Sequence, residues 1–126
     1  MKVRDIMSSP AITVTLEDAA KYALDLMKEK DVNGTPVVDS NGKLEGMVVK
    51  ADIYRFLIEP GHIGDCPIDW VMSNDVVSIA PDETVYSANR KLRDKKVTSV
   101  PVVEDGVVVG VVSFEDLLDY YLDREC

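Results

Sequence analysis

The sequence contains one pattern twice, and this duplication limits the available folds more than any other feature. Pro36 matches Pro101 and Met7 matches Met72 at a single offset of 65 positions, and Val-Val follows each proline. Self-similarity at a fixed spacing indicates repeated structural units, and two copies of roughly 60 residues are too few and too long for a solenoid. A lobe of that size buries little surface by itself, so we expect the copies to fold as one pseudo-twofold pair.

The most informative stretch runs from Thr98 to Asp116 in the second copy. Two valine-rich runs of strand length are separated by Glu-Asp-Gly, which is typical of a tight hairpin because glycine accepts positive φ. The second run ends at Ser113, after which apolar residues recur with helical spacing. Ser113 is therefore predicted to cap a helix, with Asp116 in its first turn, where the helix dipole favours a carboxylate. A hydroxyl, a carboxylate and backbone amides meet there, and we expect the chemistry of the protein at this point.

Each copy is predicted to form strand, helix, strand, strand and helix, which makes the chain an α/β duplicate. In the first copy, residues 12–14 alternate like a short strand, and Thr15 is expected to cap the helix that follows. In the second copy, residues 76–79 form the corresponding strand, and Pro81 lies near the first turn of the next helix.

A connector rich in proline and glycine separates the copies and divides the chain into residues 1–58, 59–68 and 69–126. A short amphipathic segment opens each copy, and Trp70 is expected to anchor the second of these segments to the core. The last helix carries more apolar residues than one buried stripe requires, so part of it is expected to form a dimer face. These residues are Leu117, Leu118, Tyr120, Tyr121 and Leu122.

Composition excludes several classes of function. A formal charge of −9 opposes binding to nucleic acid or to anionic lipid. No apolar run approaches membrane-spanning length, so a cytoplasmic protein without membrane insertion is expected. The two cysteines, Cys66 and Cys126, form no disulfide framework and are expected to be free thiols. His62 lies close to Cys66 in the connector, but these residues supply too few ligands for a metal site, and none is predicted.

With the repeat established, the chain resembles a CBS-domain pair (the cystathionine β-synthase type, or Bateman module). The resemblance covers almost the whole chain, and its markers are Asp5-Ile6-Met7, Trp70-Val71-Met72, the two Pro-Val-Val strands and the segment Gly110–Asp116. It implies CBS motifs at residues 1–58 and 69–126, packed through their sheets as a stand-alone regulatory module. Members bind AMP, ADP, ATP or S-adenosylmethionine between the repeats and usually form homodimers through their helices.

The resemblance also implies the residues of two ligand sites. In the family, the Ser/Thr and Asp of a Ser-x-x-Asp element hold the ribose, which is reasonable because a carboxylate accepts hydrogen bonds from both ribose hydroxyls. The better site is expected to contain Ser113, Asp116, Ala11, Ile12, Asn33, Gly34 and Thr35. A second and weaker site is expected to contain Asp52, Val76, Val77, Thr98 and Ser99.

Two departures from the family pattern affect these sites. Val49 occupies the position equivalent to Ser113, and the neighbouring Lys50 is expected to compete for Asp52 as an ion-pair partner. Nucleotide-binding members often carry Arg or His just before the strand proline, but neither copy has a cation there. This difference favours AMP, S-adenosylmethionine or another weakly charged adenosine compound over ATP. The remaining candidates for phosphate contacts are Lys50, Arg55 and Lys96.

The function implied is regulatory: an adenosine-containing effector binds and shifts the packing of the halves or subunits, and a partner protein responds to the shift. An alternative is a structural or dimerisation module that has lost its ligand, which Val49 and the missing cation favour. An enzyme acting on nucleotides is a third hypothesis, but the only histidine lies in the connector and neither cysteine has a nearby base. We therefore expect no catalytic residues and no required cofactor, and the sequence names neither the effector nor the partner.

Overall fold

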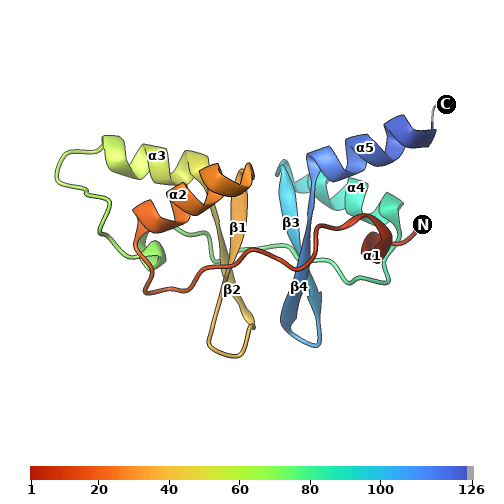
Figure 1. Ribbon diagram of the computed structural model, residues 1–126, viewed down its shortest axis with the longest axis horizontal. Coiled ribbons are helices and arrows are strands. Elements are labelled where there is room, and N and C mark those ends of the chain that lie inside the picture. The colour runs from red at the N-terminus through yellow and green to blue at the C-terminus, as the bar shows by residue number, and fades with distance from the viewer. Residues whose placement is uncertain (125–126) are drawn as a thin grey trace. The chain divides into compact units, whose positions relative to one another are not determined.

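The structure is a computed structural model that describes residues 1–124, so Cys126 lies outside the described residues. The chain alternates helices with β-hairpins, and Figure 1 shows their arrangement within each half. The elements are α1 (Val3–Ile6), α2 (Ala20–Lys30), β1 (Gly34–Val38), β2 (Leu44–Val49), α3 (Lys50–Ile58), the 3-10 helix η1 (Ile68–Trp70), α4 (Val85–Lys95), β3 (Ser99–Glu104), β4 (Val107–Ser113) and α5 (Phe114–Arg124).

The chain divides into two compact units. Unit 1 combines residues 1–11 with residues 77 onward, and unit 2 contains residues 12–76. Each unit therefore combines most of one copy with the short segment that opens the other copy. Helix α1 opens the first copy but packs in unit 1 with α4 and α5, and η1 opens the second copy but packs in unit 2 with α2 and α3.

Each unit is built on one antiparallel hairpin, β1–β2 in unit 2 and β3–β4 in unit 1. The predicted tight turn of the second copy is confirmed, because Asp105 and Gly106 between β3 and β4 both have positive φ. That combination gives the turn twist that suits a two-residue hairpin loop. The hairpins pair equivalent ends, since Gly34 lies opposite Val49 and Ser99 lies opposite Ser113. Each hairpin thus ends where the following helix begins.

The short strand expected at the start of each copy is reduced to a single bridge residue. Val14 pairs in parallel with Val37, and Ile79 pairs in the same way with Val102. Extending either pairing toward the N-terminus would require an N–H from the proline that precedes the bridged valine, and proline has none. The strand-forming pattern is present, but the ladder stops after one residue.

Two predicted helix starts are wrong by several residues. Helix α2 begins at Ala20, because Thr15 forms a turn in which its N–H donates to the Asp18 carboxylate at 2.8 Å. Helix α4 begins at Val85, and its cap is Thr84, whose hydroxyl accepts from the N–H of Ser87 at 3.1 Å. In both copies a separate turn, stabilised by its own side-chain contact, precedes the helix.

Each unit has its own hydrophobic core. In unit 1, residues of α4, β3, β4 and α5 surround the buried Val3 and Ile79. In unit 2, residues of α2, β1, β2 and α3 surround Val14 and Ile68. The anchoring role expected for Trp70 is wrong, because its side chain is 65% exposed and the neighbouring Ile68 fills the core instead.

Three further findings concern the described residues. None of the helices within residues 1–124 has the length and hydrophobicity required to span a bilayer. In the same range, no cluster of three or more His, Cys, Asp or Glu side chains is arranged to hold a metal ion. Cys66 is a free thiol, as expected.

Candidate functional site

The predicted corner at the start of α5 is present in unit 1. Ser113 and Asp116 form a reciprocal capping box: the N–H of Ser113 donates to Asp116 Oδ2 at 2.9 Å, and the N–H of Asp116 donates to Ser113 Oγ at 3.1 Å. The chain is held further because the N–H of Phe114 donates to the carbonyl of Thr98 at 2.8 Å. These bonds fix the half-buried Asp116 carboxylate, and within residues 1–124 it forms no ion pair.

The opening segment of the chain contributes a further hydroxyl to this corner. Ser8 is paired with Val111 of β4, and its Oγ lies 3.4 Å from Asp116 Oδ1 and 3.5 Å from Asp116 Oδ2. The adjacent Ser9 is directed elsewhere, since its hydroxyl donates to the carbonyl of Val109 at 3.1 Å. We refer to Ser8, Ser113 and Asp116 as the unit 1 corner.

The equivalent corner of unit 2 has a different character. Asp52 is the third residue of α3, as Asp116 is of α5, but the residue before the helix is Val49, which has no side-chain oxygen to cap it. The expected ion pair between Lys50 and Asp52 is wrong: the guanidinium of Arg55, one helical turn along, pairs with Asp52. This spacing favours a contact on one helix face.

Two further unit 2 residues of the predicted sites, Asn33 and Gly34, lie close to this helix start. The carbonyl of Asn33 accepts from the N–H of Lys50 at 2.9 Å, and Gly34 pairs with Val49. We refer to Asp52, Arg55, Asn33 and Gly34 as the unit 2 corner.

Thr35 carries the one polar side chain that is fully buried among the described residues, at 0% exposure. Its hydroxyl donates to the carbonyl of Ile12. A continued parallel ladder would bring an N–H from Pro36 to this carbonyl, and the Thr35 hydroxyl takes the place of that missing donor. The equivalent residue of the second copy is Val100, which has no hydroxyl.

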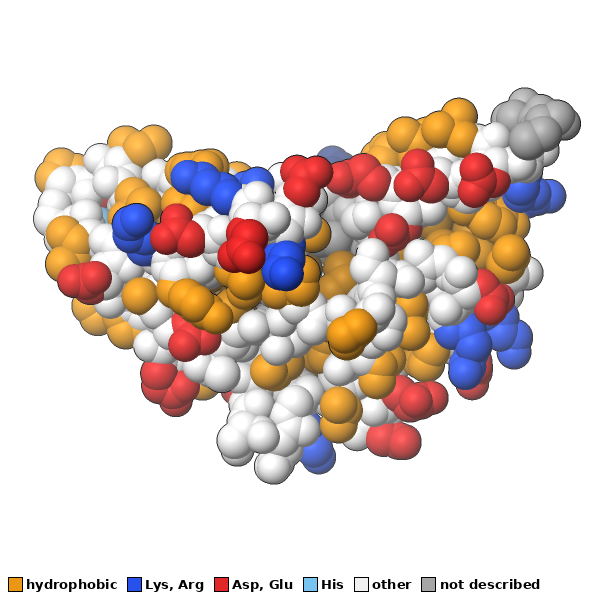
Figure 2. Space-filling model, in the orientation of Figure 1, with side chains coloured by type: hydrophobic (Ala, Val, Ile, Leu, Met, Phe, Trp, Pro, Cys, Tyr) orange, Lys and Arg blue, Asp and Glu red, His pale blue; other side chains and the backbone are white. Residues whose placement is uncertain are grey.

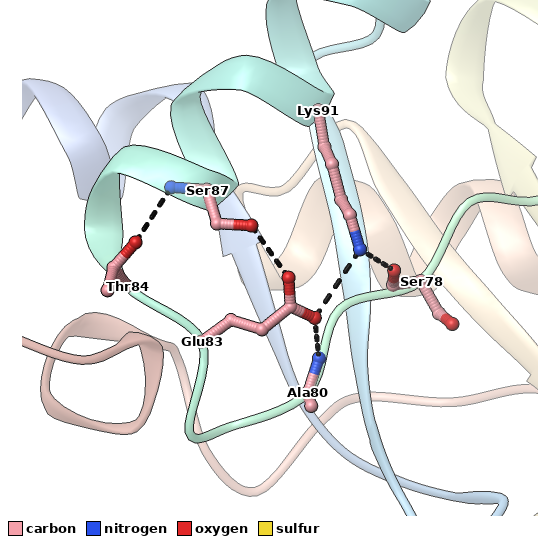
Figure 3. A network of polar contacts seen from close by, with 6 residues as sticks. All are labelled: Ser78, Ala80, Glu83, Thr84, Ser87 and Lys91. Atoms are coloured by element: carbon pink, nitrogen blue, oxygen red, sulfur yellow. Dashed lines mark hydrogen bonds and ion pairs between the residues drawn. The ribbon is translucent and has the colours of Figure 1, made fainter.

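The segment that carries Val77 is held by the polar network drawn in Figure 3. The ammonium of Lys91, on α4, donates to the carbonyl of Ser78 at 2.9 Å and lies 3.4 Å from Glu83 Oε2. Glu83 also accepts from the N–H of Ala80 at 2.8 Å and from the hydroxyl of Ser87 at 2.6 Å. Burial raises the pKa of Glu83, but these hydrogen bonds and the Lys91 charge outweigh it, so the pKa lies below its usual range.

Both predicted ligand sites draw residues from both units. Unit 1 brings together Ser113, Asp116, Thr98 and Ser99, and unit 2 brings together Asp52, Asn33 and Gly34 as one set and Ile12 and Thr35 as another. Ala11 closes the first segment of unit 1, and the boundary between the units falls between Val76 and Val77. The grouping of these residues into two adenosine sites therefore stays a prediction.

Negative charge surrounds the unit 1 corner. Acidic side chains follow α5 in Figure 2, and this helix carries Asp116, Asp119 and Asp123. These three carboxylates and that of Asp5, on α1, line a cavity of about 350 Å³, where the guanidinium of Arg124 is the basic group. The Tyr120 hydroxyl accepts a hydrogen bond from this guanidinium at 3.0 Å. The local potential opposes a strongly anionic ligand.

Sequence reasoning missed two contacts at these corners. Ser8 was not predicted to approach Asp116, although Met7-Ser8 and Met72-Ser73 are identical pairs at the repeat offset. Arg55 was considered only for phosphate, although its spacing of three from Asp52 predicts an ion pair on a helix.

Comparison with known proteins gives a consistent result over the whole chain. The family described as the CBS domain matches residues 3–59 and 63–123. The CBS domain-containing protein YhcV of Bacillus subtilis is 31% identical over 123 residues, which are 98% of this chain and 87% of that protein. The solved CBS domain pair of protein MJ0100, in complex with 5′-methylthioadenosine and S-adenosyl-L-methionine, matches with a TM-score of 0.89 and 30% identity over 98% of each chain. The structure of CBSX2 in complex with AMP matches with a TM-score of 0.87 and 25% identity, covering 99% of this chain and 98% of that one.

Several curated relatives are much longer proteins. The chain spans 14%, 22% and 24% of the lengths of three enzymes that match it. In each of those enzymes, the chain matches only a segment of about its own length, and the rest of the enzyme has no counterpart in it.

Proposed function

The chain belongs to the CBS-domain family, and from this premise we propose that it is a regulatory module that binds an adenosine-containing ligand. The ribose is proposed to bind at the unit 1 corner. One observation carries this proposal: reciprocal hydrogen bonds orient Asp116, and no cation among the described residues neutralises it. A fixed carboxylate of this kind accepts hydrogen bonds from a vicinal diol, and bonds to a charged group contribute about 1.5–3 kcal/mol. Similar domain pairs have been solved with adenosine compounds bound.

The charge around the corner supports a ligand with few phosphates. Asp5, Asp119 and Asp123 line the same cavity as Asp116, and the chain has a formal charge of −9. The negative charges of a triphosphate are repelled by such a cluster, whereas a cationic sulfonium or a neutral thioether is not repelled. We therefore propose S-adenosylmethionine, 5′-methylthioadenosine or AMP ahead of ADP and ATP.

The unit 2 corner is proposed to be the weaker site. A diol that approaches Asp52 competes with the guanidinium of Arg55, which already pairs with that carboxylate. The positions proposed to complete the two sites are those predicted from the sequence: Ala11, Ile12, Asn33, Gly34 and Thr35 for the first, and Val76, Val77, Thr98 and Ser99 for the second.

Signal transmission is proposed to use a second copy of the chain and a partner protein that binds one ligation state more tightly. Helix α5 supports a homodimer, because Leu117 faces the core while Phe114, Leu118 and Leu122 are exposed. These exposed residues recur at a spacing of four, which places them on one helix face. A mass measurement by light scattering, with and without ligand, tests this part of the proposal.

The experiment that tests ligand binding is a thermal-shift screen with adenosine, AMP, ADP, ATP, S-adenosylmethionine, 5′-methylthioadenosine and NAD. A ligand at 100 times its Kd stabilises the native state by about 2.7 kcal/mol, which moves the melting midpoint by several degrees. Asp116→Asn keeps the shape of the capping residue and removes its charge, so it is expected to abolish most of the shift. Glu115→Gln is the matched control, because it removes a charge from the same helical turn.

The outcomes separate the rival functions. A shift that survives Asp52→Asn but is lost in Asp116→Asn supports one dominant site at the unit 1 corner. No shift with any compound contradicts ligand binding and favours a structural or dimerisation module. Turnover of ATP or AMP during the incubation, followed by chromatography, would instead indicate an enzyme.

A further inference from the structure

The position of Ser8 is fixed by the backbone of β4. Its N–H donates to the carbonyl of Val111 at 2.9 Å, and its carbonyl accepts from the N–H of Val111 at 3.1 Å. The approach depends on Gly110, since a Cβ there would lie 2.9 Å from the Ser8 carbonyl oxygen and 2.7 Å from Met7 Sδ. The hydroxyl of Ser8 therefore has a defined location beside α5.

The contact between Ser8 and Asp116 is long. Its two distances of 3.4 and 3.5 Å exceed the 2.5–3.0 Å that is usual for a hydroxyl bonded to oxygen. The hydroxyl is nearly equidistant from both carboxylate oxygens, so neither holds it firmly. Ser9 differs, because its hydroxyl already serves a backbone carbonyl. The Ser8 hydroxyl thus donates to Asp116 only through long hydrogen bonds, which a shorter bond to a ligand oxygen could replace.

A vicinal diol needs hydrogen-bond donors as well as acceptors. Each of its hydroxyls donates one hydrogen and accepts through two lone pairs, whereas an ionised Asp116 only accepts. Ser113 Oγ already accepts from the N–H of Asp116 and has one hydrogen left to donate. The corner therefore has one further hydroxyl that can donate to the diol, and it belongs to Ser8.

We infer that Ser8 is a third ribose-contacting residue, which donates to a diol oxygen while Asp116 accepts from the diol hydroxyls. This inference rests on the proposed function and extends it to a residue of the opening segment. It makes Ser8 a determinant of selectivity for ribose over deoxyribose, because a ligand without the contacted hydroxyl gains nothing from it.

The duplicated chain provides a control for this inference. Ser73 is equivalent to Ser8 and pairs with Met47 of β2 as Ser8 pairs with Val111. In unit 2, however, the carboxylate equivalent to Asp116 pairs with Arg55. Ser73→Ala is therefore expected to leave binding at the unit 1 corner unchanged.

The test is calorimetric or NMR titration with adenosine, 2′-deoxyadenosine and 3′-deoxyadenosine, supported by AMP and 2′-deoxy-AMP. Ser8→Ala is expected to weaken adenosine binding by about two- to tenfold, the range for one net hydrogen bond. The same variant leaves the affinity for one of the two deoxy analogues unchanged, which isolates the pairwise contact as in a double-mutant cycle. Ser8→Thr keeps a hydroxyl and is expected to restore the ratio, while Ser9→Ala does not alter it.

Each other outcome has a defined meaning. Equal weakening of all three nucleosides by Ser8→Ala overturns the inference, because it assigns Ser8 a role in holding Asp116 or the fold. Unchanged affinities also overturn it and leave the proposed function intact. A wild-type protein that binds none of these compounds refutes adenosine binding itself, and the inference falls with it.

Discussion

Replacing Gly110 with alanine tests how the opening segment of the chain is held against β4. The new Cβ would lie 2.7 Å from Met7 Sδ and 2.9 Å from the carbonyl oxygen of Ser8. Because the second contact is with backbone, a side-chain rotation cannot relieve it. Either the segment moves away and loses its two bonds to Val111, or the clash remains as strain.

Both routes lower the free energy of unfolding by a similar amount. Two backbone hydrogen bonds contribute about 1–3 kcal/mol together, and overpacking in a well-packed site costs about 1–3 kcal/mol. For a chain of this length we expect the melting midpoint to fall by about 5–15 °C. The direction of the change in stability is informative, because replacing glycine with alanine inside a strand ordinarily stabilises a protein by about 0.5–1 kcal/mol.

The assay is thermal and urea denaturation followed by circular dichroism, with amide exchange at Val111 as the local measurement. Gly46→Ala is the matched variant in unit 2, where the Cβ would lie 2.6 Å from the carbonyl oxygen of Ser73, and we expect a comparable loss. Met7→Ala removes the contacts of the new Cβ with Met7 Sδ and Cγ but also the packing of Met7 on the core, so we expect Gly110→Ala to cost less stability in the Met7→Ala background than in the wild type. A Gly110→Ala protein that melts at or above the wild-type midpoint would refute the reasoning.

Two further changes probe the interior of each unit. Thr35→Val removes the donor to the buried Ile12 carbonyl at nearly constant volume, so we expect a loss of about 1–3 kcal/mol by urea denaturation, and an unchanged midpoint would contradict this role. Glu83 has a pKa that is lower in the folded than in the unfolded protein, so its stabilisation is present above the unfolded pKa and is lost as the pH falls through the folded pKa. Wild-type stability should therefore decrease more steeply than that of Glu83→Gln as the pH falls below about 4.3, the ordinary value for glutamate. Parallel curves for the two proteins would show that the Lys91 network has no net effect on that carboxylate.

Much of the fold and part of the site could be predicted from the sequence because those features depend on nearby residues. The turn at Asp105 and Gly106 and the helix start at Ser113 are set by the chemistry of a few consecutive positions, and both are confirmed. The duplication can be read directly from the sequence, and the tandem CBS architecture that the resemblance implies is confirmed by the family match.

The errors arise where different local structures share one sequence pattern. Thr15 and Asp18 have the spacing of a helix cap, yet they close a turn ahead of α2, because the same side-chain to backbone bonds stabilise both structures. Trp70 is expected to anchor the second opening segment to the core, but in the 3-10 helix η1 the neighbouring Ile68 is the buried residue instead. The contact of Ser8 with Asp116 joins residues 108 positions apart, and no local pattern reports it.

The two corners differ in a way that would give a duplicated chain one dominant site, as the proposed function requires. The carboxylates of Asp52 and Asp116 are equivalent, but the residue three positions later is Arg55 in the first copy and Asp119 in the second. In the first copy this residue neutralises the carboxylate, so a diol must displace a guanidinium before it can bind. In the second copy this residue adds negative charge, which would raise the electrostatic cost of placing a phosphate nearby, and Asp116 forms no ion pair within residues 1–124. Under the proposed function, this one difference accounts for the expected preference: an adenosine compound of low negative charge is favoured at Asp116, while Asp52 keeps its ion pair with Arg55.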